Sequence, residues 1–325
     1  MIKKIYTYAA NSTDPYQNLA TEKILFDKLE KDSVILYLWQ NKNTVVIGRN
    51  QNPWAECNQS AIKEDGITLA RRLSGGGAVY HDLGNLNFTF IYGEENANIE
   101  KRLTVIKKAC ELCQIEAEVS GRNDILAGGR KFSGNAFYNS KGKGFHHGTI
   151  LISVDMEKMA SYLTPPKAKL VSKGVKSVKS RTVNLSELSS LATIENMKKN
   201  MIEAFEDVYG MSAEKIPPLS QAEIDSLSAE FGNWDYIYGK SVPFNISCEK
   251  YYPWGNISVQ LQSEKGAIKD IKVYTDSMDW TIGEKTESAL IGCRLEENDI
   301  KTALSSAIES EIADDVVSLF KEVLI

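Results

Sequence analysis

Two glycine-rich segments carry the residues of this chain that are best suited to bind anions. Residues 71–82 read Arg-Arg-Leu-Ser-Gly-Gly-Gly-Ala-Val-Tyr-His-Asp, and residues 128–136 read Gly-Gly-Arg-Lys-Phe-Ser-Gly-Asn-Ala. Consecutive glycines let backbone N–H groups converge on an anion and let a ligand come close to the chain. The two segments together predict a site that holds negative charge against the backbone.

In the first segment, Ser74 adds a hydroxyl donor and the two arginines add charge. Neighbouring side chains on a strand point to opposite faces, so only one arginine reaches a shared pocket easily, and Arg72 is favoured. The Gly-Lys-Ser/Thr of a Walker loop and the spacing of a dinucleotide fingerprint are both missing. Glycines alone more often form a flexible turn, but the flanking Arg-Arg and His-Asp pairs favour an anion site.

Lys131 lies in the second segment, framed by glycines in a predicted strand. Its ammonium could touch a carboxylate oxygen and an α-phosphate oxygen of ATP together, which would offset the repulsion between those two anions. A carboxylate is already ionised near neutral pH, so this step needs no general base. Taken alone, such a lysine would more often be a surface residue of a hairpin.

Other polar residues near these segments predict a metal site and a lid. Mg²⁺ usually accompanies ATP and prefers a carboxylate with phosphate oxygens and waters, so Asp124 is a candidate ligand and Asn123 its hydrogen-bond partner. An Asx turn is the alternative for this pair. His146 and His147 are adjacent on a strand, so one is expected to line the pocket and the other to be structural. The basic run between residues 167 and 181 is either a solvated face or a lid over a nucleotide.

Strand patterns with helices between them predict an α+β fold with a mixed sheet rather than a doubly wound one. A first helix is expected after the cap Asp14, and others at 99–113, 194–209 and 221–230. Strands are expected at 34–39, 44–48, 67–71, 86–92, 117–119, 124–126, 130–138 and 147–153. A hairpin within 254–274, followed by helices near 284–291, 297–309 and 311–323, predicts a small two-layer α/β domain. We therefore divide the chain into residues 1–246 and 247–325.

Composition limits the class of protein. The chain has 325 residues and a net charge of −5, which argues against a general nucleic-acid binder. No apolar run approaches the length of a membrane span, and the first residues read as a strand rather than a signal peptide, so a cytoplasmic protein is expected. The five cysteines are odd in number and irregularly spaced, which favours free thiols over disulfides or a zinc site.

Several linked motifs resemble the lipoate–protein ligase family. They lie at 71–88, 131–136 and 146–151, with further similarity at 45–54, 172–181 and 251–255. The resemblance extends over nearly the whole chain. It implies a biotin/lipoate-ligase-like catalytic domain followed by an accessory C-terminal domain.

The resemblance also implies a two-step reaction. Lipoate and ATP, with Mg²⁺, give lipoyl-AMP and pyrophosphate, and the lipoyl group then passes to a lysine of an acceptor. The implied acceptors are lipoyl domains of 2-oxoacid dehydrogenase acyltransferase subunits and the glycine cleavage H protein. The residues implied to bind lipoate are Lys131, Arg72 and His147. Those implied to bind the nucleotide are Arg72, Ser74, Gly76, Gly77, Ala78, Val79, Tyr80, Asn123 and Lys131, with Lys173, Lys176 and Arg181 in an adenylate-covering loop.

Three alternatives stay open. A cysteine-dependent octanoyl or lipoyl transferase of the same fold would form an acyl-thioester without ATP, but no cysteine closely follows the Lys131 or His147 motif. A biotin ligase is disfavoured because the glycine segment fits that family poorly. A non-catalytic protein that binds lipoate or the acceptor is a further alternative, and pyrophosphate release would exclude it.

Overall fold

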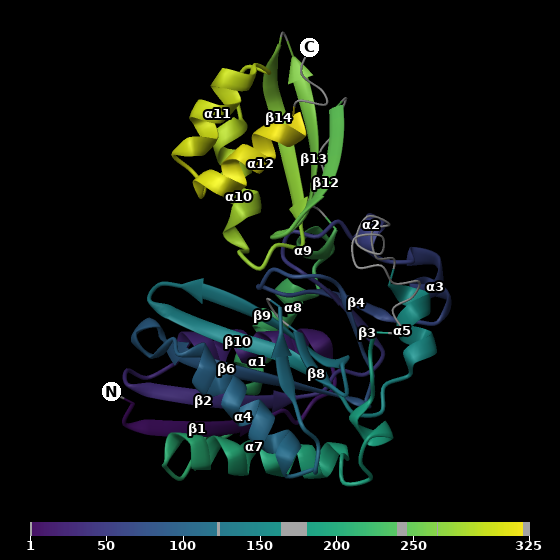
Figure 1. Ribbon diagram of the computed structural model, residues 1–325, viewed down its shortest axis with the longest axis vertical. Coiled ribbons are helices and arrows are strands. Elements are labelled where there is room, and N and C mark those ends of the chain that lie inside the picture. Colours follow the sequence, from purple (N-terminus) through teal and green to yellow (C-terminus); the bar gives the residue numbers. More distant parts are fainter. Residues whose placement is uncertain (1, 122–123, 164–180, 239–245, 265, 321–325) are drawn as a thin grey trace.

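The computed structural model describes residues 2–121, 124–163, 181–238, 246–264 and 266–320, and its N-terminal unit is built on an eight-stranded mixed sheet (Figure 1). The strand order is β11-β1-β2-β6-β10-β9-β8-β7, with β11, β1 and β2 parallel and the rest antiparallel. In chain order these strands are β1 (Lys4–Ala9), β2 (Ser33–Trp39), β6 (Asn85–Gly93), β7 (Glu118–Ser120), β8 (Asp124–Ala127), β9 (Arg130–Ser140), β10 (Lys143–Leu151) and β11 (Glu214–Lys215). The predicted α+β class with a mixed sheet is confirmed.

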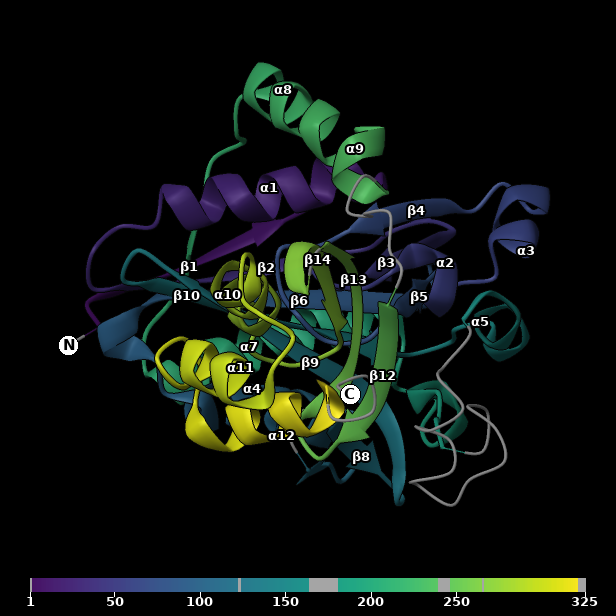
Figure 2. The ribbon, with the colours of Figure 1, turned by 90° about the horizontal axis from the view of Figure 1, so that it is seen from above.

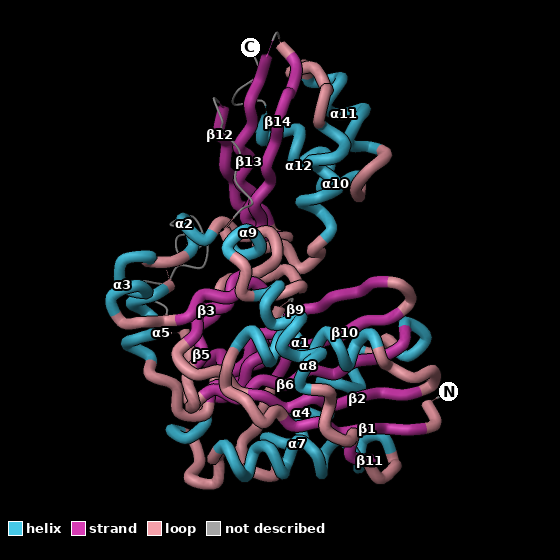
Figure 3. The backbone as a smooth tube through the Cα atoms, turned by 180° about the vertical axis from the view of Figure 1, so that it is seen from behind, coloured by secondary structure: helices cyan, strands magenta, loops and turns pink. Residues whose placement is uncertain are grey.

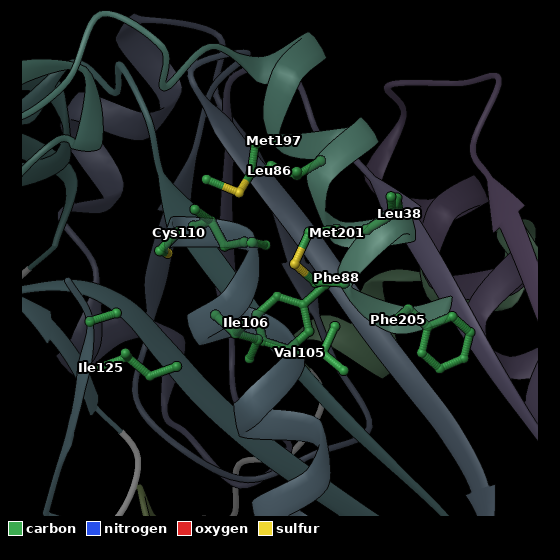
Figure 4. Packing of buried hydrophobic residues seen from close by; sticks show 14 of the residues in the cluster. Leu38, Leu86, Phe88, Val105, Ile106, Cys110, Ile125, Met197, Met201 and Phe205 are labelled. Carbon is green, nitrogen blue, oxygen red and sulfur yellow. The ribbon is translucent and has the colours of Figure 1, made fainter. Parts of the chain in front are cut away.

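Helices cover both faces of this sheet and bury its apolar side chains. One face packs against α1 (Pro15–Asp27) and α8 (Gln221–Phe231), and the other against α4 (Ile99–Glu111) and α7 (Ile194–Tyr209). Figure 4 shows side chains of α4 and α7 meeting strand residues such as Leu86 and Phe88. Each large apolar side chain buried in this way contributes about 1.5–3 kcal/mol. The sheet is therefore a rigid base for residues at its edge.

The ends of these helices follow from their capping residues. The Asp14 carboxylate accepts hydrogen bonds from the backbone N–H groups of Tyr16 and Gln17, at 2.8 and 3.0 Å, and Pro15 takes the first helical position. Helix α7 begins after Thr193, whose hydroxyl accepts from Asn196, and ends at Gly210 with φ 67°. The predicted bounds of α7 agree with the structure.

A second, three-stranded sheet holds the first glycine-rich segment. Its order is β4 (Thr68–Arg71), β3 (Thr44–Ile47) and β5 (Val79–His81), so residues 72–78 cross from one side of β3 to the other. Short helices α2 (Pro53–Glu56), α3 (Gln59–Glu64) and α5 (Met156–Tyr162) surround this sheet. The sequence analysis did not predict β5 or α5. The remaining short elements are α9 (Trp234–Ile237) and the 3₁₀ turns η1 (Glu94–Asn96) and η2 (Leu185–Glu187).

The C-terminal unit has a core of its own. Strands β12 (Ile246–Tyr252), β13 (Gly255–Glu264) and β14 (Ala267–Thr275) form an antiparallel sheet. One face carries α10 (Thr281–Leu290), α11 (Glu297–Ser305) and α12 (Ser310–Phe320), as Figure 3 shows from behind. The three helices and the hairpin lie near their predicted positions, whereas β12 was not predicted.

The turn between β14 and α10 joins the C-terminal unit to the N-terminal one. The Gly76 N–H donates to Ser277 O at 3.0 Å, and Asn50 Nδ2 donates to Trp280 O at 2.7 Å. The Trp280 ring lies 4.9 Å from the Tyr138 ring and 4.6 Å from the Arg49 guanidinium, which also pairs with Glu284 at 2.6 Å. Seen from above, the C-terminal unit lies over the eight-stranded sheet (Figure 2).

Within the described ranges, no helix is long and apolar enough to cross a membrane. The cytoplasmic location predicted from the sequence stays a prediction.

Candidate active site

A cavity of about 470 Å³ lies between the two sheets and the C-terminal unit. One part of its wall is apolar and includes Leu19, Trp39, Val46, Ala136, Leu151 and Met159. Another part is polar and includes Asp124, Lys131, Thr149 and Arg181, while Tyr251 and Asp276 come from the C-terminal unit. The cavity can therefore take a ligand with an apolar tail and a charged head.

Lys131 projects into this cavity from β9. Its ammonium lies 2.7 Å from Asp124 Oδ1, and its side chain is 33% exposed, so it faces the cavity rather than open solvent. A Cβ at Gly134 would lie only 3.0 Å from the ammonium, which explains the glycine beside it. The lysine backbone is fixed as well, since its N–H donates to Arg181 O and its carbonyl accepts from Val183 N–H, at 2.8 and 2.9 Å.

Arg72 shapes the glycine loop from beneath. Its buried guanidinium donates to Gly75 O at 2.7 Å, Gly77 O at 2.8 Å and Val46 O at 3.1 Å. Burial lowers the pKa of Arg72 to about 10, so the group stays cationic at neutral pH. Arg72 also lines the cavity, whereas Arg71 does not, so the structure places the favoured arginine at the site.

Arg71 holds the surrounding chain together instead. Its fully buried side chain donates to the carbonyl groups of Gly48, Arg49, Gln51, Tyr236 and Ile237. These carbonyls belong to the loop after β3 and to α9, which are distant in the sequence.

Two predicted nucleotide contacts need correction. Ser74 is fully buried and does not line the cavity, because its hydroxyl is bonded to Arg72 Nε at 3.0 Å and to His147 Nε2 at 2.7 Å. Gly76 does line the cavity with φ 89°, but its N–H is bonded to Ser277 O. Ser74 therefore offers no donor to the cavity, and Gly76 can contribute to a nucleotide site through its place in the wall but not through its N–H.

The adjacent histidines face opposite sides, and His147 is the one at the cavity. His147 Nδ1 lies 2.8 Å from Glu22 Oε1, and its ring is 5% exposed. His146 packs on the other face of the sheet, with Nε2 2.7 Å from Asn135 Oδ1 and its ring stacked on Phe137. Burial lowers the pKa of His146 well below its usual value, so it is neutral.

The other predicted site residues divide into two groups. Gly77, Ala78, Val79, Tyr80 and Arg181 all line the cavity, as does Asp124. Asn123, Lys173 and Lys176 lie outside the residues that the structure describes.

Sequence reasoning missed several residues of the cavity wall and its support. Glu22 is 1% exposed and bonded to His147, although it lies on a helix with polar residues. Its spacing after Leu19 and before Phe26 places it on the apolar face of α1, and this was a readable signal. Trp39 and Asp276 line the cavity without any local motif, whereas Asn87 and Tyr251 lie within the motif segments 71–88 and 251–255 but were given no role.

The predicted Mg²⁺ ligand Asp124 is one of three acidic residues, with Glu56 and Asp276, among the described residues that line the cavity. In the described part of the chain, no three His, Cys, Asp or Glu residues are arranged to hold a metal ion. Mg²⁺ often binds through one or two carboxylates and takes its other ligands from phosphates and water. Asp124, which lines the cavity beside Lys131, fits that mode of binding.

The positions of the cysteines argue against a thioester mechanism. All five are free, and none belongs to the described residues that line the cavity. Burial raises the pKa of Cys57 and of Cys110 to about 12, so neither forms a thiolate near neutral pH.

The fold and the cavity define the class of protein. Residues 14–206 match the family profile of the lipoyl protein ligase A/B catalytic domain, and residues 241–320 match that of the bacterial lipoate protein ligase C-terminus. Lipoate-protein ligase A of Bdellovibrio bacteriovorus is 37% identical over 94% of this chain and 93% of its own length. Lipoate-protein ligase A of Psychrobacter cryohalolentis is 38% identical over 89% and 88%. The chain therefore belongs to the lipoate–protein ligase A family, whose enzymes carry out the ATP-dependent lipoylation of acceptor domains.

Solved structures agree with this assignment. The crystal structure of P. falciparum LipL1 in complex with lipoate matches with a TM-score of 0.84 and 31% identity, over 97% of this chain and 98% of that one. A lipoate-protein ligase A bound with ATP matches with a TM-score of 0.61 and 23% identity, over 73% and 96%. The archaeal bipartite ligase from Thermoplasma acidophilum, described with its E2 lipoyl domain, matches with 0.63 and 23%, over 76% and 100%. The last two show likeness of fold only.

Proposed function

We propose that this cavity activates lipoate with ATP at Lys131, and that Lys131 is the catalytic residue. The observation that carries the proposal is the Lys131 ammonium, which faces the same cavity as the glycine loop and the apolar wall. A relative of known structure binds lipoate and another binds ATP. The apolar wall suits the lipoyl chain, and the polar part suits the phosphates.

In the first step, a carboxylate oxygen of lipoate attacks the α-phosphorus of ATP. The bond from that phosphorus to the bridging oxygen breaks, and pyrophosphate leaves with the electron pair. Lys131 lies where it can neutralise both reacting anions, which lowers the cost of their approach. In the second step, the amine of an acceptor lysine attacks the acyl carbon, AMP leaves, and the amine proton passes to water.

We assign the surrounding residues to supporting roles. Arg72, Gly76, Gly77, Ala78, Val79 and Tyr80 form the nucleotide wall, with Asn123 expected beside it, and His147 lies below the lipoate carboxylate. The segment with Lys173, Lys176 and Arg181 is proposed to cover the adenylate. Asp124 would hold Mg²⁺ together with phosphate oxygens, and the ion would supply further positive charge to the leaving pyrophosphate.

The acceptor is proposed to be a lipoyl domain. A relative is described with its E2 lipoyl domain, and the second step needs only an exposed lysine that reaches the cavity. We extend the proposal to the glycine cleavage H protein as a second acceptor. Residues 1–246 are proposed as the catalytic domain and 247–325 as the accessory domain, which the separate C-terminal core supports.

The test is the mass of a purified E2 lipoyl domain after incubation with the enzyme, lipoate, ATP and Mg²⁺. The expected result is a gain of one lipoyl group on one lysine, and no gain when ATP is omitted. The same reaction with H protein tests the second acceptor. If neither acceptor gains mass and no pyrophosphate is released with lipoate and ATP alone, the proposal is wrong.

The cysteine-dependent alternative is tested by replacing each of the five cysteines with alanine. Because none of them lines the cavity, we expect every variant to keep lipoylation activity within about twofold of the parent after correction for folded protein. A variant that folds, as judged by circular dichroism, but loses all transfer would favour the thioester route.

A further inference from the structure

A buried hydrogen-bond chain runs beneath the cavity and begins at Glu22 on α1. Glu22 Oε1 lies 2.8 Å from His147 Nδ1, His147 Nε2 lies 2.7 Å from Ser74 Oγ, and Arg72 Nε lies 3.0 Å from the same hydroxyl. All four side chains are at most 6% exposed. The chain thus connects a buried carboxylate to the buried guanidinium that shapes the glycine loop.

Donors and acceptors can be assigned along these hydrogen bonds, starting from Arg72 and ending at Glu22. Arg72 Nε–H must donate to Ser74 Oγ, since a guanidinium has no acceptor. The Ser74 O–H then donates to His147 Nε2, because its other acceptor, Gly75 O, is 3.4 Å away. His147 is left with Nδ1–H, which donates to Glu22. Each donor has a good acceptor in this arrangement.

Glu22, His147 and Ser74 are hydrogen-bonded in the same order as the carboxylate, histidine and serine of a catalytic triad, but the serine does not face the cavity. Ser74 is fully buried, does not line the cavity and receives a hydrogen bond from a cation. A serine in that position is not available to attack a substrate. This chain of hydrogen bonds therefore holds Arg72 in place, and the Arg72 guanidinium in turn donates to Gly75 O and Gly77 O.

A second branch leaves the same carboxylate oxygen. Thr89 Oγ1 donates to Glu22 Oε1 at 2.7 Å and accepts from Trp39 Nε1 at 3.0 Å. Trp39 lines the apolar part of the cavity. Glu22 Oε2 has no hydrogen-bond partner among the described residues, so both branches converge on Oε1 alone.

We infer that Glu22 is a positioning residue that fixes both halves of the site, the glycine loop through His147 and Ser74 and the apolar wall through Thr89 and Trp39. The inference rests on the proposed function, in which these halves bind nucleotide and lipoate. A buried carboxylate is costly unless its hydrogen bonds are well formed, and the two bonds to Glu22 Oε1 from His147 and Thr89 meet that need while tying both branches to one group. The carboxylate also gives the buried Arg72 a counter-charge.

The experiment compares three variants in lipoate- and ATP-dependent pyrophosphate release, measured with the full chain. Ser74→Ala cuts the first branch, and we expect mainly KM for ATP to rise, by about tenfold, with a smaller rise in KM for lipoate because Arg72 and His147 are also assigned to lipoate. Thr89→Val cuts the second branch, and the opposite pattern is expected. Glu22→Gln keeps the shape but removes the charge, and both constants are expected to rise.

Controls separate positioning from general loss of structure. Glu206→Gln changes a half-buried carboxylate on α7 that accepts from the Ala213 N–H, far from the cavity, and should change neither constant. Thr89→Ser keeps the hydroxyl and should restore the lipoate constant. Thermal unfolding of each variant reports its folded fraction.

Two failures are distinguishable. If the parent enzyme releases no pyrophosphate, the proposed function fails and the inference with it. If the parent is active but Glu22→Gln keeps both constants, or if Ser74→Ala and Thr89→Val shift mainly the same constant, the two-branch role of Glu22 is overturned.

Discussion

The Lys131 ammonium lies 2.7 Å from the Asp124 carboxylate in the polar part of the cavity, so the charge of each group affects how the other can bind a substrate. Without a substrate, the carboxylate balances the ammonium. When phosphates enter, the same carboxylate would repel them unless the lysine or a bound Mg²⁺ offsets its charge. We therefore expect the pair to hold the Lys131 ammonium in position before substrates arrive.

We predict that Lys131→Ala lowers the rate of lipoyl-AMP formation at least about a hundredfold while leaving the fold intact, because the charge between the reacting anions is lost. Lys131→Arg should restore little activity, since a planar guanidinium does not replace a compact ammonium. Lys269→Ala is the matched control, because Lys269 also pairs with a carboxylate at 2.7 Å, on the remote hairpin. Near-normal adenylate formation in Lys131→Ala would contradict the assignment.

The buried histidines predict acid sensitivity. Burial lowers the pKa of His81 from 6.5 to about 3 and lowers that of His146 as well. Below about pH 6.5 both histidines take up a proton in the unfolded chain, whereas in the folded chain they stay neutral. The free energy of unfolding is therefore highest above that pH and falls as the pH decreases toward 3. Each histidine contributes a slope of about 1.4 kcal/mol per pH unit.

Urea unfolding at pH 7.5 and pH 5.0 measures this effect. His81→Gln should lose less stability than the parent protein between the two pH values, because one of the titrating groups is gone. Equal losses in the two proteins would show that His81 is not responsible.

Among the elements, the long helices and paired strands were predicted well because their signals are local. Helix α7 has a capping threonine, an amphipathic face and a terminal glycine with positive φ, and each can be read from the sequence. Strand β5 has only three residues, and it depends on pairing with β3, which no local pattern records. Helix α5 begins after Asp155, whose carboxylate accepts from the N–H groups of Glu157 and Lys158, so it had a local signal that the sequence prediction did not use.

Arg71 shows how an element can be held by one side chain. It donates to carbonyls of the loop after β3 and of α9, with little exposure to solvent. We predict that Arg71→Lys destabilises the protein by about 3 kcal/mol, because several buried carbonyls lose their donors. Urea unfolding measures this, with Arg130→Lys as the control, since Arg130 makes an exposed pair with Glu187 at 3.6 Å. An equal effect of both substitutions would contradict the anchoring role.

For the whole molecule, the site combines residues that the sequence separates widely. The motifs located the lysine and the glycine loop, and both line one cavity. The sequence did not predict that Ser74 turns inward, or that Ser277 takes the Gly76 amide, because these contacts join residues about 70 to 200 positions apart. The Ser74 contact is set by the packing of the glycine loop against β10, and the Gly76 contact by the docking of the C-terminal unit, and a single sequence reveals neither.

Docking of the C-terminal unit depends on Trp280, which contacts Tyr138 and Arg49. We predict that Trp280→Ala leaves both units folded but loosens their contact, since the aromatic and cation–π contacts together contribute about 2 kcal/mol. Small-angle X-ray scattering should show a larger radius of gyration. Trp234→Ala is the control, because Trp234 is 62% exposed and stacks only on its helical neighbour Tyr238 among the contacts described. An unchanged radius for Trp280→Ala would show that other contacts suffice.

The pairing of Lys131 with residues 181–183 has a mechanical consequence. The Lys131 N–H donates to Arg181 O and the Lys131 carbonyl accepts from the Val183 N–H, so the lysine backbone is paired with the end of the proposed covering segment and the two residues after it. A displacement of residues 181–183 would therefore displace the Lys131 backbone, and with it the ammonium, through these two hydrogen bonds. Neighbouring residues in an extended chain alternate in direction, so deleting one residue at 181–183 would turn Arg181 and Thr182 away from the cavity. The direction in which Arg181 points thus depends on the register of residues 181–183 against Lys131.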